Sequence, residues 1–336
     1  MTSPSSSADQ PSTERVRVLV TGASGFIGRR LAPALLDAGF DVRAMTRNPD
    51  TYEGAGTPVF GDVSDAATLA EPLTGIDIAY YMVHSLDSGD FERKDAEAAR
   101  AFSQAAAALG VRQIVYMGGL GDEADGLSPH LRSRREVEKL LGESGVPVTV
   151  LRAAIVVGHG GISWEITRQL VDRLPAMVAP RWVKTRTQPI AVDDVVRYLV
   201  GVADHEDAVD RVFEIGGPDQ LDYIGMLREA SKVAKGHAPP IVPVPVLTPR
   251  LSSYWLAFVT DVDRMTSRNL VDSMGTEVVV KDHSIRDIVP GEPLSYAEAV
   301  RRALAERAQE QADDLAAQSA DAEAAARSGS TGETPA

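Results

Sequence analysis

Three glycines near the N-terminus, Gly22, Gly25 and Gly28, have the Gly-x-x-Gly-x-x-Gly spacing of a phosphate-binding turn, between an apolar strand pattern and an apolar helical pattern. In such a turn the first glycine permits the tight bend, the second lets the backbone approach a pyrophosphate, and the third lets the helix pack closely on the strand. The helix N-terminus adds free N–H groups and a positive dipole end, so the pattern predicts dinucleotide binding. The alternative is a glycine-rich turn without a ligand. The expected contact residues are Gly22, Ser24, Gly25, Phe26, Ile27 and Gly28.

The residues that follow the second predicted strand bear on the choice between NAD and NADP. A protein that binds NAD usually places Asp or Glu there, to hold the ribose 2′-hydroxyl. This chain has Thr46-Arg47-Asn48 without a carboxylate, and the Arg47 guanidinium could grip a 2′-phosphate in a bidentate manner. Arg29 or Arg30 could assist from the start of the helix. The pattern favours NADP(H) over NAD, and the alternative is that Arg47 is only a surface turn residue.

Two further positions are expected to contact the cofactor. Gly61-Asp62-Val63 follows the third predicted strand, where the Asp62 carboxylate could accept from the adenine amine and Val63 could cover a face of the ring. The alternative for Asp62 is a helix N-cap, and both roles could coexist. Val83, at the end of the fourth predicted strand, is expected at the same edge of the sheet.

The elements that must position these residues alternate along the first half of the chain. Apolar stretches alternating with helical patterns indicate βαβ units, and therefore an α/β fold with a Rossmann-type, doubly wound parallel sheet. Right-handed crossovers place the carboxyl ends of the strands on one edge, where a dinucleotide lies. The predicted strands are 16–20, 42–46, 59–60, 76–83, 113–117 and 148–157, and the predicted helices are 27–38, 95–109 and 132–141.

After Gly158 the alternation weakens, which suggests a smaller C-terminal substrate lobe with segments that return to the sheet. Helices are predicted over 162–174, 193–202 and 221–233, and strands over 188–192 and 212–215, while the proline-rich stretch 239–249 cannot form a regular helix. The expected division is a disordered leader over 1–14, an NAD(P)-binding domain over 15–157, the lobe over 158–308, and an acidic, Ala-rich helix with a disordered tail over 309–336.

Composition limits the partners. The formal net charge of -14, from 34 basic and 48 acidic residues, disfavours nucleic acid and anionic lipid as partners. The chain has no cysteine, which excludes disulfides and thiolate chemistry and fits the cytoplasm. No apolar run approaches the length of a membrane span, and the six histidines lack metal-binding spacing, so neither a span nor a metal site is expected.

The motifs together resemble a known family. Residues 21–28, Arg47 and Gly61-Asp62-Val63 resemble the extended and atypical short-chain dehydrogenase/reductases, particularly their NmrA-like and complex-I-accessory-subunit-like relatives. Further stretches are similar to a bacterial NAD(P)H-binding branch of these proteins, and the resemblance covers residues 16 to 304. The stretches are 81–86, 115–121, 128–134, Arg181-Trp182 and Gln188-Pro189-Ile190.

The resemblance implies a Ser, Tyr and Lys set, with the Tyr and Lys one helical turn apart, and this chain departs from it. In the register set by residues 136–138, His130 replaces the Tyr, Arg134 replaces the Lys, and Gly118-Gly119 replaces the Ser. His130 could act as the acid, since the ordinary pKa of histidine suits proton transfer. Arg134 could hold ribose hydroxyls or a phosphate but cannot act as a base. The alternative for His130 is a helix-start residue that meets backbone or solvent.

His84 is the second catalytic candidate because it follows the fourth predicted strand, on the edge where the nicotinamide should lie. With Ser85 it could contact ribose or substrate, and the alternative is a satisfied local hydrogen bond. Beyond the sixth strand, apolar side chains could line a pocket for an apolar small molecule, although apolar residues at such spacing more often belong to the core. These side chains are Trp164, Met177, Trp182, Tyr254 and Trp255.

These observations predict an NADP(H)-binding oxidoreductase of the atypical short-chain type that acts on a small molecule. The alternative is a non-catalytic regulatory or assembly protein that binds NADP(H), which the missing Ser-Tyr-Lys set favours. A sugar-nucleotide epimerase is disfavoured, because that chemistry relies on the missing Tyr.

Overall fold

The computed structural model describes residues 15–85, 90–122, 126–179, 184–243, 260–261 and 273–329. Seven parallel strands form the main sheet, in the order β11-β6-β5-β4-β1-β2-β3. This order confirms the Rossmann-type α/β prediction. The strands are β1 (Arg17–Thr21), β2 (Asp41–Thr46), β3 (Thr57–Phe60), β4 (Ile78–Tyr81), β5 (Gln113–Gly119), β6 (Val148–Ala153) and β11 (Val212–Ile215).

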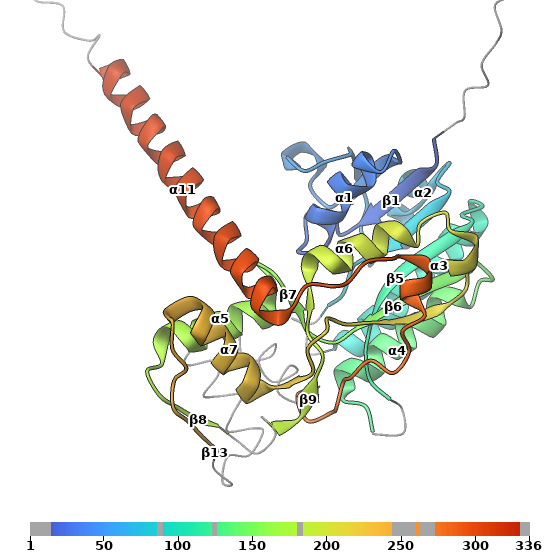
Figure 1. Ribbon diagram of the computed structural model, residues 1–336. Coiled ribbons are helices and arrows are strands. Elements are labelled where there is room, and N and C mark those ends of the chain that lie inside the picture. Colours follow the sequence, from blue (N-terminus) through green and yellow to red (C-terminus); the bar gives the residue numbers. More distant parts are fainter. Residues whose placement is uncertain are drawn as a thin grey trace, which may run out of the picture.

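Helices cover both faces of this sheet (Figure 1). One face carries α1 (Gly28–Asp37) and α6 (Val192–Gly201), and the other carries α2 (Ala70–Leu73), α3 (Phe91–Ala108) and α4 (Pro129–Gly142). The alternation of side chains along each strand divides the core into these two layers.

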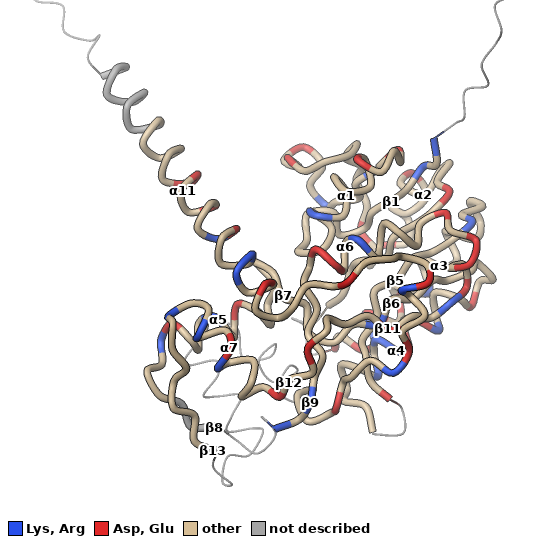
Figure 2. Tube along the Cα trace, viewed as in Figure 1, with Lys and Arg blue, Asp and Glu red and all other residues tan. Residues whose placement is uncertain are grey.

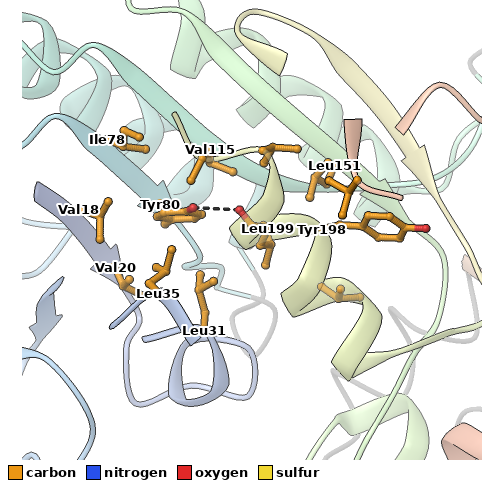
Figure 3. Packing of buried hydrophobic residues seen from close by; sticks show 14 of the residues in the cluster. Val18, Val20, Leu31, Leu35, Ile78, Tyr80, Val115, Leu151, Tyr198 and Leu199 are labelled. Atoms are coloured by element: carbon orange, nitrogen blue, oxygen red, sulfur yellow. Dashed lines mark hydrogen bonds between the residues drawn. The ribbon is translucent and has the colours of Figure 1, made fainter. Parts of the chain in front are cut away.

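Adjacent residues of β4 show this division. Tyr80 belongs to the core under α1 and α6, whereas Tyr81 belongs to the core under α3 and α4. The Tyr80 hydroxyl donates to the Leu199 carbonyl of α6 at 2.9 Å, which satisfies the polar end of a fully buried ring (Figure 3). The sheet and α6 are therefore joined by a buried hydrogen bond as well as by apolar packing.

A further group of helices packs outside the main sheet. A third core joins α5 (Ile162–Arg173), α7 (Tyr223–Lys235) and the start of α11 (Tyr296–Gly329). From Gln311 to Ala320 every residue of α11 is exposed, and Figure 1 shows this helix, in red, extending away from the body of the protein. The short elements are β7 (Val156–Val157), β8 (Met177–Ala179), β9 (Arg186–Thr187), β10 (Ile190–Ala191), β12 (Leu221–Asp222), β13 (Ile241–Pro243), α10 (Ile285–Ile288) and the 3-10 turns Pro49–Thr51, Ala66–Thr68 and Glu206–Ala208.

Two strands were predicted too long. The strand predicted over 148–157 is two strands, because both neighbours of β6 end opposite Ala153: Gly119 on β5 and Ile215 on β11. The chain then leaves the main sheet, and β7 pairs with β10 instead. The strand predicted over 188–192 likewise reduces to β10.

The surface carries both signs of charge, interspersed along the chain (Figure 2). None of the helices in the described ranges is long and apolar enough to cross a membrane. The leader predicted over 1–14 and residues 330–336 of the predicted tail lie outside the described residues.

Candidate functional site

The turn between β1 and α1 has a backbone that only glycine can form at two positions. Gly22 has a φ of +62°, which other residues rarely adopt. A Cβ on Gly28 would lie 2.2 Å from the Gly22 carbonyl oxygen and 2.8 Å from the Ala23 Cα. The Gly25 N–H donates to the Gly22 carbonyl at 2.9 Å, while Ser24 and Gly25 face solvent. The result is an open cradle of backbone at a helix N-terminus, which fits the pyrophosphate of a dinucleotide.

The end of β4 lies directly against this turn. The Met82 N–H donates to the Thr21 hydroxyl at 2.9 Å. A Cβ on Gly22 would be 3.3 Å from the Met82 carbonyl oxygen and 3.4 Å from a Val83 methyl group. Val83 therefore lies beside the turn, and its contact with the cofactor stays a prediction.

Arg47 is exposed just after β2 and makes no ion pair within the described part of the chain. Its charge contributes to lowering the pKa of Asp62, along with hydrogen bonds from Ser64 and against the raising effect of burial, so Arg47 and Asp62 are neighbours. One Asp62 carboxylate oxygen accepts from the N–H and the hydroxyl of Ser64, at 2.9 and 2.7 Å.

The second expected adenine contact, Val63, is only 7% exposed and packs in the core. It therefore offers little free surface to an adenine ring. The alternative role of Asp62 as a helix N-cap is also not seen, because Asp65 caps the following 3-10 turn by accepting from the Ala67 N–H. Asp62 remains available through its second carboxylate oxygen.

A cavity of about 290 Å³ lies between the glycine turn and the segment after β2. Arg29 lines it and also donates to the His159 carbonyl at 3.0 Å. Arg30 is not among the lining residues: its guanidinium donates to the Phe26 and His159 carbonyls and pairs with Glu306 of α11. Sequence reasoning could not separate these two arginines, and it missed the cavity wall at 51–54, whose residue types carry no signal. The lining residues are Ala23, Ser24, Arg29, Thr46, Asn48, Thr51, Tyr52, Glu53 and Gly54.

The three catalytic candidates gather at the carboxyl ends of β4 and β5. Burial, and then the Arg134 charge, lower the pKa of His130 from 6.5 to about 3. The pKa of His84 falls to about 3 by burial, by Arg134 and by His130, so the three groups face one another. His84 as a residue is exposed, although enough protein lies around its side chain for burial to lower the pKa.

These shifts correct the expectation of an acid with an ordinary pKa. Both imidazoles are neutral at pH 7, because protonation would place a second positive charge next to Arg134 in a partly desolvated site. Each neutral ring has one N–H to donate and one nitrogen to accept. Arg134 itself makes no ion pair within the described residues.

Local sequence explains how α4 presents its two candidates. The Ser128 hydroxyl caps the helix by accepting from the Leu131 N–H at 3.2 Å, and Pro129 occupies the first turn. A Cβ on Gly119 would lie 2.7 Å from a Leu131 methyl group and 3.7 Å from the Arg134 Cβ. Glycine where the family has a serine therefore lets α4 approach the end of β5 closely.

Of the five side chains that were predicted to line an apolar pocket, the structure describes that of Trp164. Trp164 is 2% exposed and belongs to the core shared with α7 and α11, so it packs rather than lining a pocket. The Met177 side chain, Trp182, Tyr254 and Trp255 lie outside the described residues. Within the described ranges, no group of His, Asp and Glu side chains gathers as a metal site would require.

Comparisons with known proteins agree with this geometry. A family model described as NAD(P)H-binding matches residues 22–206. The chain is 30% identical over 228 residues, 64% of its length, to a (4-alkanoyl-5-oxo-2,5-dihydrofuran-3-yl)methyl phosphate reductase of Streptomyces griseus. It is 25% identical over 209 residues, 60% of its length, to a photosystem II assembly factor of Cyanophora paradoxa. The chain spans 73% and 63% of the length of these two relatives, and 25% of the length of uncharacterized mycobacterial relatives.

Solved structures share the fold. An NADPH-dependent quinone oxidoreductase of Escherichia coli, solved with NADPH, superposes with a TM-score of 0.68 at 19% sequence identity. The superposition covers 84% of this chain and 98% of that one. At this identity the likeness establishes the arrangement of the strands and helices.

Proposed function

Since the chain belongs to the NAD(P)H-binding family of Rossmann-fold proteins, we propose that it is an NADP(H)-dependent oxidoreductase of the atypical short-chain type, acting on a small molecule. The observation that carries the proposal is the position of two sites on one sheet edge. The glycine turn follows β1, and the cluster of His84, His130 and Arg134 lies at the ends of the adjacent β4 and β5. A dinucleotide that lies along this edge reaches from one to the other.

Two arginines support NADP over NAD. Arg47 is exposed without an ion pair in the described part of the chain, and Arg29 lines the cavity beside the glycine turn. In the proposed complex both would contact the 2′-phosphate, while the backbone of Ser24 and Gly25 would hold the pyrophosphate. The reduced nicotinamide of the bound cofactor would supply a hydride.

The cleft residues would stabilise the oxygen that gains negative charge when a carbonyl or quinone accepts a hydride. His84 and His130 are neutral and each donates one N–H, as a neutral histidine does where an enzyme polarises a carbonyl. Arg134 adds a fixed positive charge nearby. The proton that completes the reduction comes from solvent, because neither imidazole carries an extra proton at neutral pH.

The test is turnover of NADPH, followed by absorbance, with a panel of quinones, enones and aldehydes. If the cleft is catalytic, His130→Gln lowers turnover by about 10²-fold or more. His237→Gln is the matched control, since His237 is exposed after α7 and its ring hydrogen-bonds to the Lys235 carbonyl. An unchanged rate in His130→Gln would remove His130 from the mechanism.

A non-catalytic NADP(H)-binding regulatory or assembly protein is the second candidate. It is favoured by the neutral state of both imidazoles, which leaves no ready proton donor in the cleft, and by the relative that is an assembly factor. Tight NADPH binding without turnover on any member of the panel would support this candidate and contradict the enzyme.

Cofactor choice has its own test. Arg47→Asp should weaken NADPH binding far more than NADH binding, because only NADPH carries the 2′-phosphate. Arg228→Asp makes the same charge change at an exposed arginine of α7 and controls for net charge. Equal losses for the two cofactors in Arg47→Asp would contradict the 2′-phosphate assignment.

A further inference from the structure

Asp95 is a buried carboxylate on α3 that the proposed chemistry does not use. The residue is 6% exposed, and the other buried residues of α3 are alanines, phenylalanines and Ser103. Burial raises the pKa of Asp95, whereas the nearby Arg134 charge and hydrogen bonds from Ser85 and Ser133 lower it. A carboxylate is seldom buried to this degree unless its oxygens have partners.

Those partners come from the two elements that carry the catalytic candidates. One Asp95 oxygen accepts the Ser85 N–H at 2.9 Å, and Ser85 directly follows His84. The other oxygen accepts the Ser133 hydroxyl at 3.4 Å, and Ser133 precedes Arg134 on α4. A single side chain thus joins the segment after β4 to α4, from a third element.

The Asp95 carboxylate interacts electrostatically with charged and titratable side chains near it. Arg134 is the cation whose charge acts on Asp95. Tyr81 lies close enough for the Asp95 charge to raise its pKa and the Arg134 charge to lower it, beside the larger effect of burial. Asp95 therefore supplies a counter-charge near Arg134, without the two forming an ion pair among the described residues.

We propose that Asp95 is a positioning residue, which holds the segment after β4 against α4 so that His84, His130 and Arg134 face one cleft. The catalytic consequence rests on the proposed function, but the positioning itself does not. A displacement of about 1 Å of such groups can cost roughly 10²-fold in rate. Asp95 would act through the groups it holds and would not touch substrate.

Two substitutions at Asp95 separate the effect of losing its hydrogen bonds from the effect of losing its charge. Asp95→Leu removes both acceptors and the charge. Asp95→Asn keeps a carbonyl oxygen for the Ser85 N–H, and its amide can donate to the Ser133 hydroxyl, so only the charge is lost. Ser103→Ala is the matched control, because the Ser103 hydroxyl donates to the Leu141 carbonyl at 2.6 Å and joins the same two helices far from the cleft.

With a substrate from the panel, Asp95→Leu should lower kcat on the order of 10²-fold. The dissociation constant for NADPH should stay within about twofold, because Asp95 does not contact the glycine turn. Asp95→Asn should restore most of kcat, and Ser103→Ala should leave kcat near that of the original protein. Equal losses in Ser103→Ala and Asp95→Leu, or no loss in Asp95→Leu, would overturn the proposal.

A second readout does not need turnover. In the full chain labelled with ¹⁵N-histidine, the ring signals of His84 and His130 should shift in Asp95→Leu and also in Ser133→Ala, which removes only the α4 contact. They should not shift in Ser103→Ala. Signals that stay unchanged in Ser133→Ala would overturn the proposal even if Asp95→Leu does not fold, whereas shifted signals without turnover would leave Asp95 as a positioning residue and contradict only the oxidoreductase.

Discussion

Gly28→Ala tests the glycine turn most directly, because the structure gives the contact that the added methyl group would make. The new Cβ would lie 2.2 Å from the Gly22 carbonyl oxygen, 2.8 Å from the Ala23 Cα and 2.9 Å from the Gly22 carbonyl carbon. All three atoms belong to the backbone of the turn, so no side-chain rotation relieves the overlap. The start of α1 must instead move away from β1.

The size of that movement sets the expected effect. Separating the Cβ and the Gly22 oxygen to ordinary van der Waals contact requires a shift of about 1 Å. Overpacking of this kind typically costs about 1–3 kcal/mol, and the shift displaces the N–H groups that face the pyrophosphate. If the loss falls on binding, 1–3 kcal/mol corresponds to a roughly 5- to 150-fold weaker affinity for NADPH.

Two other glycines complete a graded series. In Gly25→Ala the Cβ would be 3.1 Å from the Gly22 oxygen, and in Gly142→Ala it would be 3.7 Å from a Val148 methyl group, an ordinary contact. Gly142 ends α4 and is far from the turn. We therefore expect the affinity for NADPH, measured by titration of cofactor fluorescence, to fall most in Gly28→Ala, less in Gly25→Ala and not at all in Gly142→Ala.

Thermal unfolding of the same variants separates loss of the turn from loss of the fold. Gly142→Ala should be neutral or stabilising by up to about 1 kcal/mol, since alanine is the better helix former. If Gly28→Ala bound NADPH as tightly as Gly142→Ala, the close packing of Gly28 on the turn could not be what shapes the cofactor site, and the reasoning would be refuted.

Two further predictions concern pH and a buried ion pair. Because the pKa of His130 is about 3 in the folded chain and near 6.5 when unfolded, the unfolded chain binds more protons between these values, so stability falls as pH is lowered through this window. At pH 5 the free energy of unfolding should be lower by at most about 2 kcal/mol because of His130, and by less because of the exposed residue His84. NMR spectra check this prediction: a ring signal of either residue that titrates near pH 6.5 would contradict it. Glu138→Gln should destabilise the protein by about 2–4 kcal/mol in urea unfolding, since the Glu138 carboxylate, whose side chain is 14% exposed, pairs with Arg152 and Arg135 and the substitution removes its negative charge from beside both guanidinium groups. A change below about 0.5 kcal/mol would show that water replaces the carboxylate.

The fold class and the turn could be predicted because their causes are local. The glycine spacing fixes which backbone conformations the turn can adopt, and the apolar patterns on either side fix a strand and a helix. The break between β6 and β7 could not be predicted in the same way. It depends on where β5 and β11 end, and β11 lies some sixty residues further along the chain.

The candidate site also has features that the sequence predicts and features that it does not predict. The types and register of His84, His130 and Arg134 are visible in the sequence, but their state of charge is not, because a pKa depends on burial and on charges from other elements. The wall of the cavity at 51–54 and the bridge made by Asp95 are equally invisible, since each is defined by contacts between distant segments.

By itself, then, the sequence determined that this protein has a glycine turn for a dinucleotide on an α/β sheet, because a short run of residues controls its own backbone. Only the tertiary structure decided that Arg29 lines the cavity while Arg30 pairs with Glu306 of α11, and that two histidines are held in the neutral state near one arginine. Each outcome depends on contacts and charges from several segments that are far apart in the sequence. A short stretch of sequence therefore does not predict it.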